Sequence, residues 1–136
     1  SSLLHFYLGS LRYMPQYRKF HKREEQNESE THSIINAALR YMEENLEQSI
    51  TLHNLAEYTG YSNSHFSAIF KSATGHSPLS YFNKLKIKKA CELLDTTDMR
   101  INQISYKMGF EDSFYFSRLF SKIVGISPKK YRESKK

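Results

Sequence analysis

The chain has 136 residues, of which 39% are hydrophobic, and its formal net charge is +6 with a pI near 9.4. This length allows one domain, or one domain with an appendage, and the charge favours an anionic partner. The single cysteine, Cys91, excludes an intramolecular disulfide and fits a reducing compartment, so we expect a cytoplasmic protein with Cys91 as a small core residue. No run of about 18 apolar residues occurs, which argues against a membrane span.

The first part of the chain differs in character from the rest. The chain begins Ser-Ser rather than with Met, so we expect a fragment of a longer protein. Apolar residues recur at rough helical spacing over residues 3–20, and residues 21–30 are polar without periodicity, which is typical of a linker. From residue 31 onward the pattern becomes regular.

The regular part predicts helices separated by short turns. A helix is expected over 31–46, because apolar residues recur there at i, i+3 and i+4 spacing. Thr51 is a suitable N-cap for a helix over 52–59. Gly60 is expected to end that helix in the left-handed conformation, and another helix follows over 63–74.

The second half is predicted to contain a long helix over 79–94 and shorter ones over 101–108, 112–124 and 128–133. The residues of the long helix that we expect to face inward are Leu79, Phe82, Leu85, Ala90, Leu93 and Leu94. Its lysines are expected to face mostly outward: Lys84, Lys86, Lys88 and Lys89. No alternating stretch of strand length occurs, so the predicted fold class is all-α.

Residues 52–81 and 101–131 carry the same pattern of helix, glycine turn, helix and glycine stop. The shared positions include Gly60, Phe66, Phe70, Gly75 and Pro78 in the first copy, and Gly109, Phe116, Phe120, Gly125 and Pro128 in the second. One glycine between two amphipathic helices is most often a plain helix hairpin. Two copies with the same aromatic punctuation instead predict two helix-turn-helix units that dock at two points on one DNA duplex.

The second helix of each unit is the expected DNA reader, with its phenylalanines toward the core and its other face in the major groove. The outward positions, which are candidate base readers, are Ser64, Ser67 and Ala68 in 63–74, and Ser113, Phe114, Ser117 and Arg118 in 112–124. Arg118 is the strongest candidate, because its guanidinium can bond guanine O6 and N7 together. Phe114 fits either an apolar contact to DNA or a packing role.

Basic residues gather late in the chain, with seven Lys or Arg against Glu133 over residues 113–136. The candidate phosphate contacts are Lys71, Lys122, His65, Ser62, Asp112 and Lys86. Ser62 and Asp112 are included because helix N-termini offer backbone N–H groups to phosphate. Lysines in the long helix are also typical of a solvated face.

Residues 109–120 (GFEDSFYFSRLF), followed by GISP at 125–128 and by Tyr131-Arg132, resemble the signature of the DNA-binding domain of the AraC/XylS family of bacterial transcription regulators. The first copy matches more loosely, through Leu55-Ala56, Gly60-Tyr61-Ser62, Phe70-Lys71 and Gly75-His76-Ser77-Pro78. The resemblance implies seven helices in two helix-turn-helix lobes, over about 31–78 and 95–132, joined by a linker helix over 79–94. Recognition helices 63–74 and 112–124 would then enter adjacent major grooves.

The resemblance also implies what surrounds this domain, which is expected to span residues 31–136. Residues 1–20 resemble the last helix of an upstream sensor or dimerisation domain, so residues 1–30 would be its end plus a linker. The expected partners are double-stranded operator or promoter DNA, RNA polymerase, and a second copy through the upstream domain or residues 1–20. No cofactor is implied, and an activator associated with the nucleoid is expected.

Other classes of function make different demands on the sequence. A helical protein-interaction module with an acidic partner would also use a basic surface and stays open. Catalysis has no supporting constellation, because the six histidines lack metal-ligand spacing. The neighbours His65 and Ser67, and His76 and Ser77, lie at positions that the repeat already explains. We therefore expect a DNA-binding protein that is not an enzyme, with specificity weighted toward the second unit.

Overall fold

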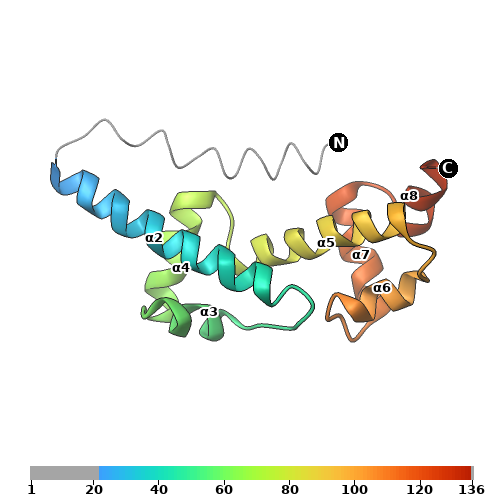
Figure 1. The fold of residues 1–136 in the computed structure, drawn as a ribbon, viewed down its shortest axis with the longest axis horizontal. Helices are drawn as coiled ribbons and strands as arrows, with labels where there is room; N and C mark the ends of the chain where they lie inside the picture. Colours follow the sequence, from blue (N-terminus) through green and yellow to red (C-terminus); the bar gives the residue numbers. More distant parts are fainter. Residues whose placement is uncertain (1–21, 136) are drawn as a thin grey trace.

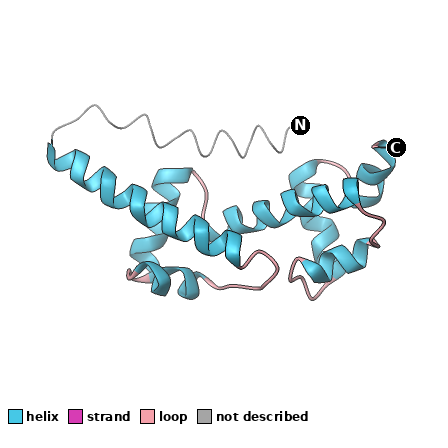
Figure 2. Cartoon of the chain, in the orientation of Figure 1, coloured by secondary structure: helices cyan, strands magenta, loops and turns pink. Residues whose placement is uncertain are grey.

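A computed structural model describes residues 22–135, and the side chains from residue 28 onward. Over this range the chain forms seven helices and no strand (Figure 2), which confirms the predicted all-α class. The helices are α2 (Lys22–Glu44), α3 (Leu52–Thr59), α4 (Asn63–Thr74), α5 (Pro78–Thr96), α6 (Ile101–Lys107), α7 (Ser113–Val124) and α8 (Pro128–Ser134). Residues 1–20, which we assigned to an upstream domain, lie outside the described residues.

Two lobes lie side by side, joined by α5 (Figure 1). Helices α2, α3 and α4 with the first half of α5 form lobe 1, and the second half of α5 with α6, α7 and α8 forms lobe 2. The expected arrangement of two helix-turn-helix lobes on one linker helix is therefore confirmed.

Helix α2 begins at Lys22, so the helix start expected near residue 31 is wrong, and the polar residues from Lys22 to residue 30 are helical. The physical reason is propensity: Lys, Arg, Glu and Gln lose little side-chain freedom in a helix. A polar stretch of such residues can extend an amphipathic helix without burying any surface. The other helices begin and end within about two residues of their expected positions, the usual uncertainty of helix ends.

The helix ends follow the predicted local chemistry. Thr51 Oγ1 accepts a hydrogen bond from the Asn54 backbone N–H at 3.1 Å, and Asn54 Oδ1 accepts one from Thr51 N–H at 3.0 Å. This reciprocal capping box satisfies two donors that the first turn of α3 leaves open. The turn glycines Gly60 and Gly109 have φ angles of 84° and 81°, a region that side chains with a Cβ rarely adopt.

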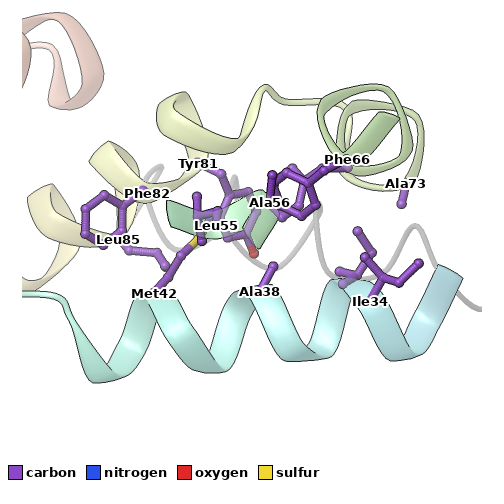
Figure 3. Packing of buried hydrophobic residues seen from close by; sticks show 12 residues of the cluster. Ile34, Ala38, Met42, Leu55, Ala56, Phe66, Ala73, Tyr81, Phe82 and Leu85 are labelled. Atoms are coloured by element: carbon purple, nitrogen blue, oxygen red, sulfur yellow. The ribbon is translucent and has the colours of Figure 1, made fainter. Parts of the chain in front are cut away.

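Each lobe has its own hydrophobic core. In lobe 1, Ala38 and Met42 point from α2 toward Leu55 and Ala56 (Figure 3), and all four are almost completely buried. The linker helix contributes to both cores, as the buried residues on it show. Those in lobe 1 are Tyr81, Phe82 and Leu85, and those in lobe 2 are Ile87, Ala90, Cys91 and Leu94.

Two expectations for the faces of α5 are wrong. Leu79, expected inward, is 39% exposed, although its neighbours Pro78 and Tyr81 in the first turn of α5 are buried. The equivalent residue of α8, Lys129, is exposed too. Lys86, expected outward, is 3% exposed. It lies four residues after Phe82 and four before Ala90, so it shares the helix face that both of them bury.

Helix α8 closes lobe 2 through Arg132, the last residue of the signature. Its guanidinium donates hydrogen bonds to the carbonyls of Leu94 at 3.2 Å, Thr97 at 3.1 Å and Met99 at 2.5 Å. These are carbonyls at and just beyond the end of α5, where the helix itself supplies no partner. Arg132 therefore has a structural role that the planar, five-donor guanidinium suits.

Ser105 of α6 is fully buried, and its hydroxyl has no hydrogen-bond partner among the described residues. Lobe 1 has Ala56 at the equivalent position. Ser105→Ala should therefore stabilise the protein by about 1 kcal/mol, since a buried hydroxyl without a partner loses its hydration. Urea unfolding measures the change, with Ala56→Ser as the reciprocal, destabilising control. An unfolding free energy that falls in Ser105→Ala would show that the hydroxyl is satisfied.

Cys91 is 7% exposed in the core of lobe 2, as expected for a packing residue. Burial raises the pKa of its thiol to about 11. At pH 8 the folded protein should react with iodoacetamide more than about a hundredfold slower than the guanidinium-unfolded chain, because the thiolate is the reactive species. Mass spectrometry of timed, quenched samples gives both rates. Comparable rates would place the thiol at the surface.

Candidate nucleic-acid interface

The second helix of each helix-turn-helix unit is α4 in lobe 1 and α7 in lobe 2, and each has 12 residues. Both run upright in the view of Figure 1, and the first helices of the units, α3 and α6, lie along the same edge of the molecule. The second unit has one more residue between its turn glycine and its helix. Gly60 is followed two residues later by the N-cap Ser62, and Gly109 three residues later by the N-cap Asp112. The extra residue therefore lengthens the turn and leaves the two helices equivalent, position by position.

Aromatic rings anchor each recognition helix to its lobe in the same way. In lobe 1 the centroids of Phe66 and Phe70 lie 5.7 Å apart, and Tyr81 meets Phe70 edge-on at 5.4 Å. The equivalent rings in lobe 2 are Phe116, Phe120 and Tyr131, with separations of 6.0 and 5.7 Å. All four phenylalanines are fully buried, which confirms their expected direction. Each contributes about 1.5–3 kcal/mol by burial, and the opposite helix face stays free.

All seven candidate base readers lie at least partly exposed on these free faces. Arg118, Phe114, Ser64 and Ala68 are exposed, and the three remaining candidates are half-buried: Ser67, Ser113 and Ser117. Phe114 is 77% exposed, so a packing role for it within this chain is wrong. Arg118 and Ala68 occupy equivalent positions of the two helices.

Most candidate phosphate contacts are also exposed. Lys71 and Lys122 lie on the C-terminal halves of α4 and α7, and His65 lies in the first turn of α4. The two N-caps are less suited to phosphate. Ser62 Oγ accepts the His65 backbone N–H at 3.2 Å, so this donor of the first turn is already used.

Asp112 caps α7 with a carboxylate. Its Oδ1 accepts the Phe114 backbone N–H at 2.9 Å. The carboxylate is favourable at a helix N-terminus, but it adds a negative charge where a phosphate would approach. The chemistry of this cap argues against Asp112 as a phosphate contact.

Lys86 was expected to contact phosphate, and the structure shows that this expectation is wrong. Its Nζ donates to the carbonyls of Leu46 at 2.8 Å and Gln48 at 2.5 Å, and also to that of Met108. All three N–H groups are used inside the protein, and the side chain is buried. A phosphate outside cannot be reached.

Sequence reasoning missed a cluster of basic side chains between the two recognition helices, formed by Lys84, Lys122 and His76. Lys84 Nζ lies 3.2 Å from Nδ1 of His76, which follows α4. Burial, followed by the charge of Lys84, lowers the pKa of His76. Burial, followed by the charge of Lys122, lowers the pKa of Lys84. Because the three residues come from the α4–α5 loop, α5 and α7, only the packing of the lobes brings them together.

The described residues give no support to other kinds of site. Among them, no group of three or more His, Cys, Asp or Glu side chains is placed to hold a metal ion. Within the same part of the chain, no helix combines the length and apolarity that a membrane crossing requires.

A family model described as a helix-turn-helix domain matches residues 55–134. The MmsAB operon regulatory protein of Pseudomonas aeruginosa is 43% identical over 93 residues, which cover 68% of this chain and 30% of that protein. The chain spans between 18% and 36% of the lengths of the first three curated relatives that it matches.

Solved structures give the same result. A Chromobacterium violaceum transcriptional regulator with an AraC-type DNA-binding domain superposes with a TM-score of 0.72 at 28% identity, covering 77% of this chain and 94% of that one. The DNA-binding domain of the transcriptional factor AdpA, solved with a target DNA, superposes with a TM-score of 0.70 at 25% identity, covering 74% and 90%. With its repeated helix-turn-helix lobes and this matched domain, the chain belongs to the AraC/XylS family of helix-turn-helix transcription regulators.

Proposed function

We propose that this chain is the sequence-specific DNA-binding part of a transcription regulator, with α4 and α7 in adjacent major grooves of one duplex. The observation that carries the proposal is the repeated division of the two recognition helices into a buried aromatic face and a free polar face. A helix presented in this way fits the major groove of B-DNA, where each base pair has a distinct donor and acceptor pattern.

The linker helix supports the proposed spacing. The 19 residues of α5 span about 28 Å. One turn of B-DNA is about 34 Å, and successive major grooves on one face are separated by that distance. Two lobes packed on the two halves of α5 are therefore of the right size to reach neighbouring grooves.

The two lobes should contribute unequally to specificity. Arg118 of α7 has the planar, two-pronged donor that pairs with guanine, and a good pair of this kind contributes about 1–3 kcal/mol of discrimination. The equivalent residue of α4 is Ala68, which offers only a methyl group. The exposed ring of Phe114 can contact a thymine methyl, which adds apolar discrimination to α7.

Phosphate contacts are proposed for Lys71 on α4 and Lys122 on α7, with His65 at the start of α4. The cluster of basic side chains adds Lys84 and His76 to this set, because it lies between the recognition helices. The sugar-phosphate backbone of DNA between two occupied major grooves passes the protein surface between α4 and α7. Such contacts position the protein and carry no sequence information directly.

Selection of bound duplexes from a random library tests the proposed function. We expect two preferred half-sites with centres about 10 base pairs apart, and stronger preference in the half read by α7. A competition gel shift with unselected DNA then measures the preference. Equal binding to all duplexes would overturn the proposal and favour the alternative, a module that binds an acidic protein.

Arg118→Ala should weaken binding to the selected site by about 1–3 kcal/mol and relax preference at one position. Arg40→Ala, on the exposed face of α2, is the matched control and should bind as the wild type does. Ala68→Arg places a guanidinium at the equivalent position of α4 and should create a new guanine preference in the other half-site. Unaltered sequence preference in Arg118→Ala would remove Arg118 from base readout.

Lys71→Ala and Lys122→Ala should weaken binding to all duplexes alike and lower the slope of log affinity against log salt concentration by about 1 each. Titrations at several salt concentrations measure both effects. Lys89, which lies on another face of α5 and pairs with Glu92 at 3.4 Å, provides the control as Lys89→Ala. A change in sequence preference without a change in slope would mean that these lysines read bases.

A further inference from the structure

The linker helix passes from one core to the other at Lys86. Leu85 belongs to the buried cluster of lobe 1, and Ile87 to that of lobe 2. Between them, Lys86 is 3% exposed. A charged side chain at such a place is costly unless hydrogen bonds replace its lost hydration. The partners of this ammonium group therefore show what the position is for.

The three acceptors of Lys86 come from both lobes. Leu46 and Gln48, whose carbonyls lie 2.8 and 2.5 Å from Nζ, belong to the α2–α3 loop of lobe 1. Met108, the third acceptor, is the C-cap of α6 in lobe 2. An ammonium has three N–H donors, and here each finds a carbonyl. Hydrogen bonds from a charged donor are about twice as strong as neutral ones.

The ammonium remains charged at neutral pH. Burial lowers the pKa of Lys86 to about 8, and the nearby carboxylate of Glu47 acts in the opposite direction. Two aromatic rings add to its environment: Nζ lies 4.6 Å from the ring centre of Phe82 and 5.5 Å from that of Phe110. One ring comes from the linker helix and the other from the turn before α7, so cation–π attraction acts on both sides of the junction.

Gly109 shows that the two lobes meet backbone to backbone. A Cβ at this residue would lie 2.9 Å from the carbonyl carbon of Gln48, and 3.0 Å from both Glu47 O and Lys86 Nζ. The equivalent glycine of lobe 1, Gly60, has the same positive φ, but nothing lies within 4 Å of its Cβ position. Lobe contact, in addition to the turn itself, therefore requires a glycine at 109.

The same seam carries one ion pair, between Lys107 and Glu47 at 2.7 Å. Both side chains are about half exposed, so this pair contributes little by itself. It does show that the α2–α3 loop follows the end of α6 over several residues. The contact is a continuous strip rather than a single point.

We propose that Lys86 and Gly109 lock the two lobes in one relative orientation and so set the half-site spacing that the protein accepts. The turn that begins at Gly109 leads directly into α7, so a fixed seam fixes the second recognition helix against lobe 1. Lys86 is a positioning residue, which acts on DNA through the lobes. The effect on DNA rests on the proposed function, whereas the lock itself does not.

Locking matters because two linked binding modules gain affinity only when their geometry allows both to bind. A rigid pair pre-organised for one spacing binds that spacing tightly and rejects others. Lobes that move against each other must be ordered on binding, and this cost lowers the affinity for the correct spacing. Such mobile lobes also bind duplexes with other spacings. Spacing preference is therefore the property that the lock controls.

Four variants test the lock. Lys86→Met keeps an unbranched stem and removes all three donors, and Lys86→Arg restores a charged donor group. Gly109→Ala inserts a methyl into the seam. Gly60→Ala is its matched control, because it introduces similar backbone strain without touching the other lobe. Circular dichroism establishes first that each variant is folded.

The first measurement needs no DNA. Spin labels on Asn36→Cys in α2 and Lys129→Cys in α8, both exposed positions, report the distance between the lobes by pulsed electron resonance. The wild type, Lys86→Arg and Gly60→Ala should give one narrow distance distribution. Lys86→Met and Gly109→Ala should broaden or shift it. An unchanged distribution in both would overturn the lock.

The second measurement uses the duplex recovered by selection, a duplex with only the half-site of α7, and duplexes with one or two base pairs inserted between the half-sites. Lys86→Met should lose about tenfold in affinity for the full site and less than about twofold for the half-site. Its discrimination against inserted base pairs should also fall. Equal losses on full site and half-site would overturn the effect on spacing.

The outcomes separate the two proposals. If the wild type shows no preference among duplexes, the proposed function fails, and the distance distribution alone decides the lock. If Lys86→Met does not fold, Gly109→Ala compared with Gly60→Ala decides it. If Lys86→Met broadens the distance distribution without changing the spacing preference, the lock is confirmed for the wild type, but its role in DNA recognition is excluded.

Discussion

The exposed faces of α4 and α7 depend on two buried aromatic pairs, Phe66 with Phe70 and Phe116 with Phe120. A helix of 12 residues is marginal in water by itself, so its stability must come from the face that it buries. Because the rings supply that stability, the opposite face is free to vary. This division explains how two helices with one scaffold can carry residues as different as Ala68 and Arg118.

The linker helix turns two small lobes into one body. Each lobe has only a few helices, and buried residues from one half of α5 complete its hydrophobic core. Because the lobes share α5, their relative motion is limited. Side-chain packing alone, however, opposes a rotation of one lobe against the other about this helix. The seam between the α2–α3 loop and the end of α6 adds a second connection beside the helix.

A buried lysine is an expensive way to make that connection, since an apolar residue would avoid the loss of hydration. The advantage of the lysine is that its hydrogen bonds are directional. The ammonium of Lys86 is satisfied only when Leu46, Gln48 and Met108 all bring their carbonyls to one point. Apolar contacts tolerate sliding, whereas three converging hydrogen bonds define one arrangement. Specificity of geometry, rather than added stability, is the property that such a group supplies.

The sequence alone determined the helices from residue 31 onward, the Thr51 cap, the glycine turns, the repeat and the free faces that bear the candidate readers, because these follow from spacing over a few residues. Even Lys86 lay on a predictable face, in line with Phe82 and Ala90. Only the tertiary structure decided what that face meets: Lys86 bonds a carbonyl 40 residues away. The cluster of Lys84, His76 and Lys122 has the same origin, since helical periodicity assigns a side chain to a face but does not place distant segments against it.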